Sequence, residues 1–310
     1  MVKKALIIGS GVAGLTAARH LSDAGLEVTV IDKGYKLGGR LATRTKQGYQ
    51  FDHGTPALET MAGFESAVAA GVLVQAGPEG AWYGQPEMRS LCHHLAQGLS
   101  VTQACEIDSV LVAGHQLACR LKDGTQTDTF DAVVCTAPAP QAAILLSAFD
   151  DLAALAATAD YAPQWTAMFG FGQGFSALPE AVYTATDHPV LAGMFSEPAK
   201  PGRPPLPALT LQAGMQWSAD NIELMPDQAL DALQIACSEV LGVELPAPAY
   251  AAAHRWRYAR IRKTAGASAG AIASQAPVAV AGDWVSYPDV AGSLHSAAAA
   301  AQLILARLEI

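Results

Sequence analysis

Residues 1–44 constrain the fold more than any other stretch, because two short apolar runs enclose a glycine-rich turn. The run at residues 4–8 predicts a β-strand that leads directly into the pattern Gly-x-Gly-x-x-Gly. Apolar residues about three positions apart then predict a helix that ends near Gly25. Residues 27–31 predict a second strand, and Asp32 follows it. This order of strand, turn, helix, strand and acid is typical of a dinucleotide-binding unit.

The glycines and the acid each have a physical task in such a unit. The first glycine, Gly9, permits the tight turn, and the third, Gly14, lets the helix pack closely on the sheet. Gly11 lets backbone N–H groups approach the pyrophosphate, and the Asp32 carboxylate accepts a hydrogen bond from a ribose hydroxyl. We expect the residues beside them to line the same cofactor: Val12, Ala13 and Lys33.

A second glycine motif follows the acid and distinguishes between nucleotide cofactors. Gly39 and Arg40 lie within the segment LGGRLAT, residues 37–43. This segment resembles the second motif of FAD enzymes of the amine oxidase superfamily, in which Gly-Gly-Arg precedes a hydroxyl residue. The resemblance implies FAD rather than NAD, with the glycines and the arginine along its phosphates and flavin. The alternative is an ordinary glycine-rich loop with a surface arginine.

Length and composition set limits on the domain organisation. With 310 residues, of which 51% are hydrophobic, the chain exceeds the size at which one core stops growing, roughly 250–300 residues. We therefore expect an α/β protein with two domains. The predicted FAD-binding domain comprises residues 1–60, 95–150 and 270–310, and the predicted substrate domain comprises residues 61–94 and 151–269.

Charge and cysteine usage argue against several classes of partner. A net charge of −9 argues against nucleic acid or an anionic membrane surface as the main partner. The five cysteines lack metal-binding spacing, so we expect reduced thiols, a cytoplasmic protein and no metal. The N-terminus resembles a signal peptide, but cleavage near Ala18 would destroy the glycine-rich turn, so we expect none. No run of about eighteen strongly apolar residues predicts a membrane span.

The hydrophobic pattern predicts elements along the rest of the chain. Alternation between residues 101 and 136 predicts a small antiparallel meander that ends in an apolar strand. The other predicted elements are strands at residues 162–171, 209–215 and 277–281, a helix at residues 226–241, and a last helix that begins near Val290.

Several short motifs recur, in the same order, in bacterial renalase-like flavoproteins of the amine oxidase superfamily. Asp52 and Gly54 match an Asp-x-Gly-Ala-Gln-Tyr segment of these proteins, although Pro56 and Ala57 replace the Gln and the aromatic residue. The other matching motifs lie at residues 136–141, 216–218, 246–248, 253–260 and 282–284. The chain therefore resembles a renalase-like FAD-dependent oxidoreductase over nearly its whole length.

This resemblance implies a p-hydroxybenzoate-hydroxylase-like fold, with a Rossmann-like FAD-binding domain and an α+β substrate domain on an antiparallel sheet. It also implies non-covalent FAD, hydride transfer from a reduced nicotinamide dinucleotide, and oxygen as the acceptor. The N-terminus of the last helix stabilises negative charge on the flavin in such proteins, although Ala291 stands where relatives carry Glu. The further cofactor-binding residues that we predict are Asp52, Gly54, Thr55, Ile107, Ala137, Pro138, Gly282, Asp283 and Val290.

The segment from His254 to Tyr258 supplies candidates for the catalytic site. A strand here would place His254, Trp256 and Tyr258 on one side, because side chains alternate between the two faces. We predict that this aromatic side faces the flavin and forms the catalytic site together with Trp217. His254 as a general base is one reading, and a packed histidine is the other, since hydride transfer from a dihydronicotinamide needs no base.

The basic residues of the same segment form the candidate substrate-binding group. Arg260 shares the aromatic side, whereas Arg255 and Arg257 share the opposite side. We predict that these three arginines hold phosphate oxygens of the substrate, since guanidinium groups bind phosphate bidentately. The alternative is a solvated strand face.

Two absences lower the case for oxidation of a primary amine, and a third excludes one kind of covalent flavin. Amine oxidases carry an aromatic residue before the last helix, where this chain has Asp289. They often hold a lysine near the flavin, whereas Lys200 and Lys263 lie in or beside predicted loops. No cysteine follows Cys237, which excludes a cysteinyl-flavin link from the C-terminal segment. Two alternatives stay open: a flavin amine oxidase or desaturase acting on a small amine or apolar substrate, and a non-catalytic FAD- or NAD(P)-binding protein.

Overall fold

A parallel sheet built around the N-terminal strand organises the first part of the structure, a computed structural model that describes residues 2–77, 80–172, 174–180, 182–268 and 270–310. Two units divide the chain: residues 1–39, 92–160 and 261–310 form the first, and residues 40–91 and 161–260 form the second. The predicted FAD-binding domain includes residues 40–60, which the structure places in the second unit. The reason is packing, because Tyr49 and Phe51 form a hydrophobic cluster with Met168 and Ala208.

The sheet of the first unit has the strand order β16-β17-β10-β1-β2-β7. Strand β1 pairs in parallel with β10 and β2, while β17 and β7 extend the parallel sheet on either side. Only β16 runs antiparallel, against β17. The bounds of these strands are β1 Lys4–Ile8, β2 Glu27–Ile31, β7 Ser100–Thr102, β10 Ala132–Cys135, β16 Ala271–Ile272 and β17 Val278–Val280. The predicted α/β fold class is confirmed.

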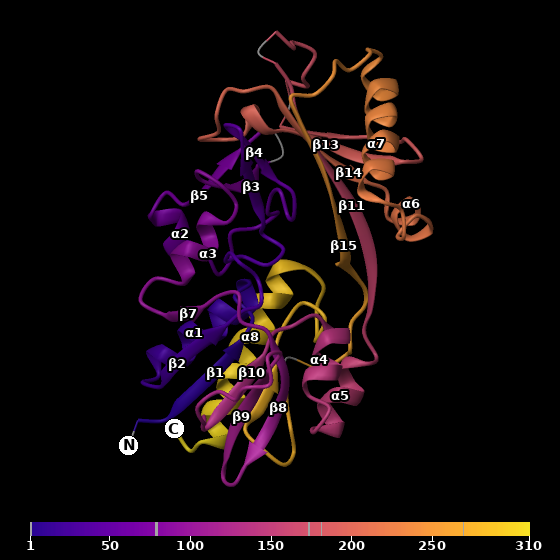
Figure 1. Cartoon of the computed structure of the whole chain (residues 1–310). Helices are drawn as coiled ribbons and strands as arrows, with labels where there is room; N and C mark the ends of the chain where they lie inside the picture. Colours follow the sequence, from indigo (N-terminus) through magenta and orange to yellow (C-terminus); the bar gives the residue numbers. More distant parts are fainter. Residues whose placement is uncertain (1, 78–79, 173, 181, 269) are drawn as a thin grey trace. The chain divides into compact units, whose positions relative to one another are not determined.

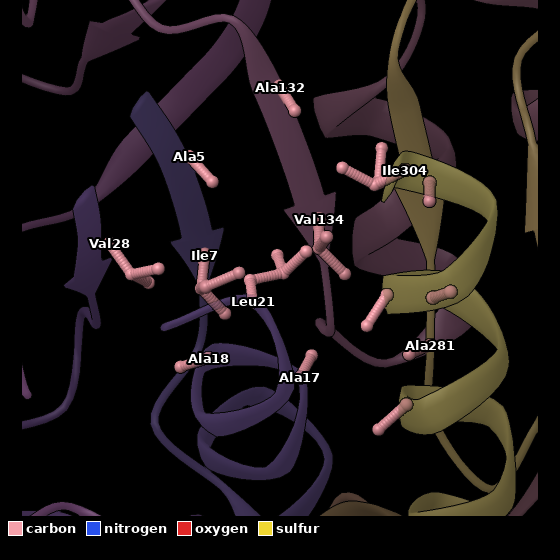
Figure 2. Close-up of a cluster of buried hydrophobic side chains, with 14 of the residues drawn as sticks. Ala5, Ile7, Ala17, Ala18, Leu21, Val28, Ala132, Val134, Ala281 and Ile304 are labelled. Carbon is pink, nitrogen blue, oxygen red and sulfur yellow. The ribbon is translucent and has the colours of Figure 1, made fainter. Parts of the chain in front are cut away.

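Helices α1 (Val12–Asp23) and α8 (Asp289–Arg307) bury the core of this unit against the sheet. Figure 2 shows Leu21 of α1 pointing toward Ile7 of β1 and Val134 of β10. All three side chains are fully buried, and each such burial stabilises the fold by roughly 1.5–3 kcal/mol. The α8 face of the cluster is made mainly of alanines, which lets the helix approach closely. Among the described residues, none forms a helix long and apolar enough to cross a membrane.

One part of the predicted meander is wrong. Residues 100–102 form β7, which joins the parallel sheet beside β2 rather than an antiparallel meander. β8 (Ile107–Ala113) and β9 (Gln116–Leu121) form an antiparallel hairpin, Gln126 and Phe130 bridge β9 in antiparallel fashion, and the chain then returns to the sheet as β10. A strand of three residues carries too little alternation to reveal its partner. Two short helices complete the unit, α4 (Ala139–Leu145) and α5 (Asp150–Ala156).

The second unit is built on an antiparallel sheet with the strand order β12-β13-β14-β11-β15 (Figure 1). Its strands are β11 Asp160–Gly170, β12 Tyr183–Ala185, β13 Leu191–Ser196, β14 Ala208–Ala213 and β15 Tyr250–Lys263. The predicted helix at residues 226–241 is confirmed as α7, Pro226–Leu241. It starts with a proline at its first position and ends at Gly242 in the left-handed conformation, with φ of 65°.

The two faces of this sheet carry different elements, because neighbouring residues on a strand point to opposite sides. Helices α6 (Met215–Asp220) and α7 pack on one face, against a core that includes Trp165 and Leu211. The hairpin of β3 (Thr43–Lys46) and β4 (Tyr49–Asp52) packs on the other, against Met168 and Ala208. We call these the helical face and the hairpin face. The unit also contains α2 Glu65–Ala69, β5 Leu73–Ala76, β6 Ala81–Gly84 and the short helix η1 Glu197–Ala199, while α3, Ser90–Leu95, begins at its boundary.

Candidate functional site

The glycine-rich turn follows β1 and leads into α1, and two of its glycines are required by the protein itself. Gly9 has φ of +108°, and a Cβ there would lie 2.6 Å from Thr136 Oγ1. A Cβ on Gly14 would lie 1.9 Å from the carbonyl oxygen of Gly9, so no larger residue lets α1 pack at this distance. The tight turn and the close helix packing therefore have the causes predicted from the sequence.

Gly11 differs from its two neighbours in the motif. Its φ of −78° is ordinary for any residue, and a Cβ there would meet no atom of the described chain within 4 Å. Space kept open at this point fits a ligand that approaches the backbone closely. The first turn of α1 has no acidic residue and Gly11 gives no side-chain cap, so the N–H groups of the α1 N-terminus can bind a phosphate. Val12 and Ala13 are the first two residues of that helix.

Asp32, after the second strand, fixes the turn and retains one acceptor position. Its Oδ2 accepts hydrogen bonds from Ser10 N at 2.5 Å and Ser10 Oγ at 2.7 Å, and its Oδ1 accepts one from Gly34 N at 2.6 Å. A carboxylate has about four lone-pair positions, so capacity for one ribose hydroxyl remains. Lys33 is exposed to solvent beside it.

The second glycine motif folds back onto the first. Gly38 N donates to the carbonyl of Ser10 at 3.1 Å, and a Cβ on Gly39 would lie 3.5 Å from Gly11 Cα. Gly39 has φ of +52°, a left-handed conformation that glycine adopts without strain. The two motifs therefore form one glycine-lined cradle, and the residues present fit the diphosphate of FAD.

Other predicted cofactor-binding residues of the first unit lie around the carboxyl ends of its parallel strands, where α/β sheets bind ligands. Ala137, after β10, accepts a hydrogen bond from Trp284 Nε1 at 3.1 Å. Gly282 N donates a hydrogen bond to Ser296 Oγ at 2.9 Å, and Asp283 is buried. Pro138 precedes α4, and Val290 lies half-buried in the first turn of α8. Ile107 begins β8 and is buried, two residues after Cys105, whose N–H donates to the Asp32 carbonyl at 3.0 Å.

The start of α8 has an unusual backbone at Asp289. Its φ is +83°, which is uncommon for a residue other than glycine. The side-chain Oδ1 accepts the N–H of Gly292 at 3.1 Å and thereby caps the helix. Ala291, beside it, is exposed. The residue in the position of the amine oxidase aromatic wall thus caps the last helix.

In the second unit, the predicted aromatic residues of β15 lie on the hairpin face. We call His254, Trp256 and Tyr258 the aromatic group. Trp256 Nε1 donates to the His53 carbonyl at 2.8 Å, and the His254 and Trp256 rings lie 4.2 Å apart. The His53 ring lies 5.2 Å from that of His254, edge to face. Tyr258 packs against Tyr161 with ring centroids 5.5 Å apart. Sequence reasoning missed His53, because its contacts come from a strand that is 200 residues later in the chain.

His53 and His254 are both neutral at physiological pH. Burial, together with the neighbouring His254 and Arg44, lowers the pKa of His53 to about 3. Burial and the charge of Arg44 lower the pKa of His254 to about 4. His254 can therefore accept or donate a hydrogen bond, but it does not supply positive charge.

The loop after β4 is tied to the segment around Arg40. Thr55 N donates to the Arg40 carbonyl at 2.7 Å, and a Cβ on Gly54 would lie 1.9 Å from the same oxygen. Arg40 Nη1 in turn donates to the Ala259 carbonyl of β15 at 3.2 Å. Gly54 is thus required for backbone packing, and Arg40 is held against the strand that carries the aromatic group.

Three predicted site residues lie on the helical face instead. Trp217, in α6, packs against the core beneath the helices. Arg255 donates to the Ile222 carbonyl at 2.7 Å and lies over the Trp165 ring, and Arg257 forms two hydrogen bonds with Glu223, at 2.9 and 3.2 Å. The alternation of the strand separates Arg255 and Arg257 from His254 and Trp256, as the sequence predicted, and the helical face is the side on which the two arginines contact Ile222 and Glu223. Arg260 shares the aromatic side and is exposed.

Asp52 is also corrected, since it lies in a buried ion cluster rather than at a cofactor surface. Its Oδ1 accepts hydrogen bonds from Thr43 Oγ1 at 2.6 Å and Met88 N at 3.2 Å. Its Oδ2 contacts Lys200 Nζ at 3.2 Å and the Arg203 guanidinium. All its acceptor positions are filled. Burial raises its pKa, but the charges of Lys200 and Arg203 outweigh this effect and hold the pKa below its usual value.

The sequence predicts that Lys200 lies in or beside a loop. In the structure its side chain is completely buried. Its Nζ lies 2.8 Å from Glu197 Oε2 as well as near Asp52. The Glu197 carboxylate also accepts the Asp52 N–H at 3.1 Å. Burial raises the pKa of Glu197 above its usual value. The four residues Asp52, Glu197, Lys200 and Arg203 are called the buried ion cluster below.

Replacing Asp32 with alanine is expected to weaken FAD retention. A hydrogen bond from a ribose hydroxyl to a carboxylate contributes roughly 1.5–3 kcal/mol, so the FAD dissociation constant should rise about ten- to a hundredfold. The variant also loses the bonds from Ser10 and Gly34, so urea unfolding of the apoprotein must be measured beside FAD titration. An unchanged FAD dissociation constant would show that the ribose lies elsewhere.

The sequence matches known proteins at two levels. Residues 65–305, most of the chain, match the profile of the flavin containing amine oxidoreductases, and residues 7–79 match that of an NAD(P)-binding Rossmann-like domain. The chain is 44% identical over 59 residues to a 4,4'-diapolycopene oxygenase of Methylomonas sp, and 48% identical over 60 residues to a 1-hydroxycarotenoid 3,4-desaturase of Flavobacterium sp. strain P99-3. Each match covers 19% of this chain and only 12% of that relative.

Solved structures match over the whole chain. A protein of Exiguobacterium sp. 255-15, provisionally described as a protoporphyrinogen oxidase, superimposes with a TM-score of 0.78 at 14% identity, covering 100% of both chains. A fatty acid isomerase from P. acnes that produces CLA gives 0.69 at 11% identity, covering 99% of both chains. At these identities the likeness shows the fold alone. The match over residues 65–305 shows that this chain belongs to the flavin containing amine oxidoreductases, as an oxidoreductase whose cofactor is FAD.

Proposed function

We propose that this flavoenzyme is renalase-like and oxidises a reduced nicotinamide dinucleotide, with oxygen as the electron acceptor. The balanced reaction is NAD(P)H + H⁺ + O₂ → NAD(P)⁺ + H₂O₂, and isomers of NAD(P)H react in the same way. Bound FAD would carry the two electrons from the donor to oxygen. The observation that carries the proposal is the aromatic side of β15, where Trp256 and Tyr258 offer flat surfaces to a nicotinamide ring.

The groups around this surface suit hydride donation. A dihydronicotinamide gives up its hydride without losing a proton, so the reaction needs no general base. His254 and His53 are neutral and packed against Trp256, which is consistent with binding and orientation. The protein's task is then to hold the ring so that its hydride carbon lies about 3–3.5 Å from the accepting atom.

Two features disfavour a primary amine as the substrate. Lys200 forms ion pairs with Asp52 and Glu197 inside the second unit, so its amino group has another task. Asp289, at the position of an aromatic wall, caps α8. Oxidation of a small amine, or desaturation of an apolar substrate, is the second candidate, favoured by the match to carotenoid enzymes.

Anaerobic reduction of the bound flavin separates these candidates. NADH, NADPH and their isomers should bleach the flavin absorbance rapidly, and readmission of oxygen should restore it with one hydrogen peroxide per donor. Primary amines and an apolar polyene serve as competing donors in the same assay. Rapid bleaching by amines or by the polyene, with every dihydronicotinamide inert, would transfer the assignment to the second candidate. A flavin that none of these donors bleaches would exclude both candidates.

A further inference from the structure

Arg44 lies at the edge of the aromatic group, on the side of the β3–β4 hairpin that faces β15. It pairs across the hairpin with Phe51, whose ring stacks on Tyr250 of β15 at 5.5 Å. Residues directly opposite each other in a hairpin share a face. The Arg44 Nη1 accordingly lies 3.5 Å from the Tyr250 hydroxyl, with the side chain half-buried.

The charge of Arg44 is not balanced by the protein. In the described part of the chain, no carboxylate lies within ion-pair distance of its guanidinium, whereas Arg255 and Arg257 pair with Glu223 and Arg203 with Asp52. A partly desolvated cation without a counter-ion lowers stability. The chain has a net charge of −9, with more carboxylates than basic side chains. An arginine left without a carboxylate partner in such a chain points to a negatively charged ligand.

The neighbours of Arg44 are further hydrogen-bond donors rather than competing charges. Tyr250 carries a hydroxyl, and neutral His254 has one ring N–H to donate. Behind it, His53 is only 6% exposed, and its Nδ1 is buried without a hydrogen-bond partner among the described residues. The charge of Arg44 acts on both rings. A guanidinium and a phenol thus lie side by side where an oxyanion can be bound by more than one donor.

We propose that Arg44 and Tyr250 form an anion-binding site that holds the diphosphate of the dinucleotide substrate. The aromatic side of β15 supports this identity, because Tyr250 and Trp256 lie on the same side of that strand. Only the source of the diphosphate rests on the proposed function; the site itself rests on the contacts of Arg44.

Binding of inorganic pyrophosphate to the FAD-loaded enzyme tests the site without catalysis. In calorimetric titrations, Arg44→Gln should weaken pyrophosphate binding roughly ten- to a hundredfold, which is the effect of one charge-assisted contact. Arg257→Gln is the matched control, because Arg257 lies on the helical face with Glu223, and it should change binding less than twofold. Arg44→Lys keeps the positive charge but loses the planar guanidinium that binds phosphate bidentately, so it should recover part of the affinity.

A second measurement links the site to the substrate. Arg44→Gln should raise KM for the reduced dinucleotide about tenfold or more, while leaving KM for reduced nicotinamide riboside, which has no phosphate, unchanged. FAD content and unfolding midpoint show whether each variant is folded. Equal pyrophosphate binding by wild type and a folded Arg44→Gln, or an equal loss in Arg257→Gln, would overturn the site. Arg44-dependent pyrophosphate binding in an enzyme that no dihydronicotinamide reduces would keep the site and overturn the proposed function.

Discussion

Replacing Gly14 with alanine is expected to abolish the folded first unit or to destabilise it by several kcal/mol. The new methyl group would lie 1.9 Å from the Gly9 carbonyl oxygen and 2.9 Å from Thr136 Oγ1. Relief requires α1 to move away from the turn, and α1 contributes Leu21 and four alanine or leucine neighbours to the core. Overpacking of a core costs about 1–3 kcal/mol when side chains can yield, and more where the obstacle is backbone. Urea unfolding of the apoprotein measures the effect.

Gly11→Ala is the matched control for the same turn. Its φ is compatible with alanine and its methyl group would meet no described atom within 4 Å, so apoprotein stability should stay unchanged or rise by about 0.4–1 kcal/mol. FAD affinity should nevertheless fall, because the methyl group enters the space that the diphosphate needs. If Gly11→Ala retains FAD as tightly as wild type, the phosphates do not lie at Gly11.

The contrast between these glycines shows why the first unit could be predicted so fully from the sequence. Several of its decisive contacts join residues within a few positions, as between Gly14 and Gly9 or Asp32 and Gly34, and the contact of Asp32 with Ser10 stays within one strand–turn–helix–strand motif. The helix α7 was predicted with both of its bounds for the same reason, since its proline and Gly242 act locally. Local effects of this kind can be recognised in a single sequence.

The second unit shows where that reasoning stops. Alternation along β15 separated His254 and Trp256 from Arg255 and Arg257, but which side meets a helix depends on residues elsewhere. Glu223 neutralises the two arginines from a loop that carries no motif. Arg44 was not predicted as a site residue, because a single arginine in a short strand indicates no function until the fold brings Tyr250 beside it.

The buried ion cluster provides the second large expected effect. Asp52→Ala should lower the free energy of unfolding by roughly 3–5 kcal/mol, because Lys200 and Arg203 would remain buried with Glu197 as their only carboxylate. Burial also raises the pKa of Glu197, so this carboxylate is a weak replacement for Asp52. Equilibrium unfolding in urea, with the FAD concentration fixed, gives the difference from wild type.

Glu223→Ala is the control for the loss of a charge. It also breaks two ion pairs with arginine, yet Glu223 is 70% exposed, so water screens these pairs and the cost should be much smaller than that of Asp52→Ala. A further variant, Asp52→Asn, separates stability from cofactor binding. Since every acceptor position of Asp52 is filled by the protein, the folded Asp52→Asn enzyme should bind FAD with the dissociation constant of wild type. Loss of FAD affinity in a folded Asp52→Asn variant would restore Asp52 to the cofactor site. If Asp52→Ala lowers the free energy of unfolding no more than Glu223→Ala does, the buried ion cluster does not hold the second unit together.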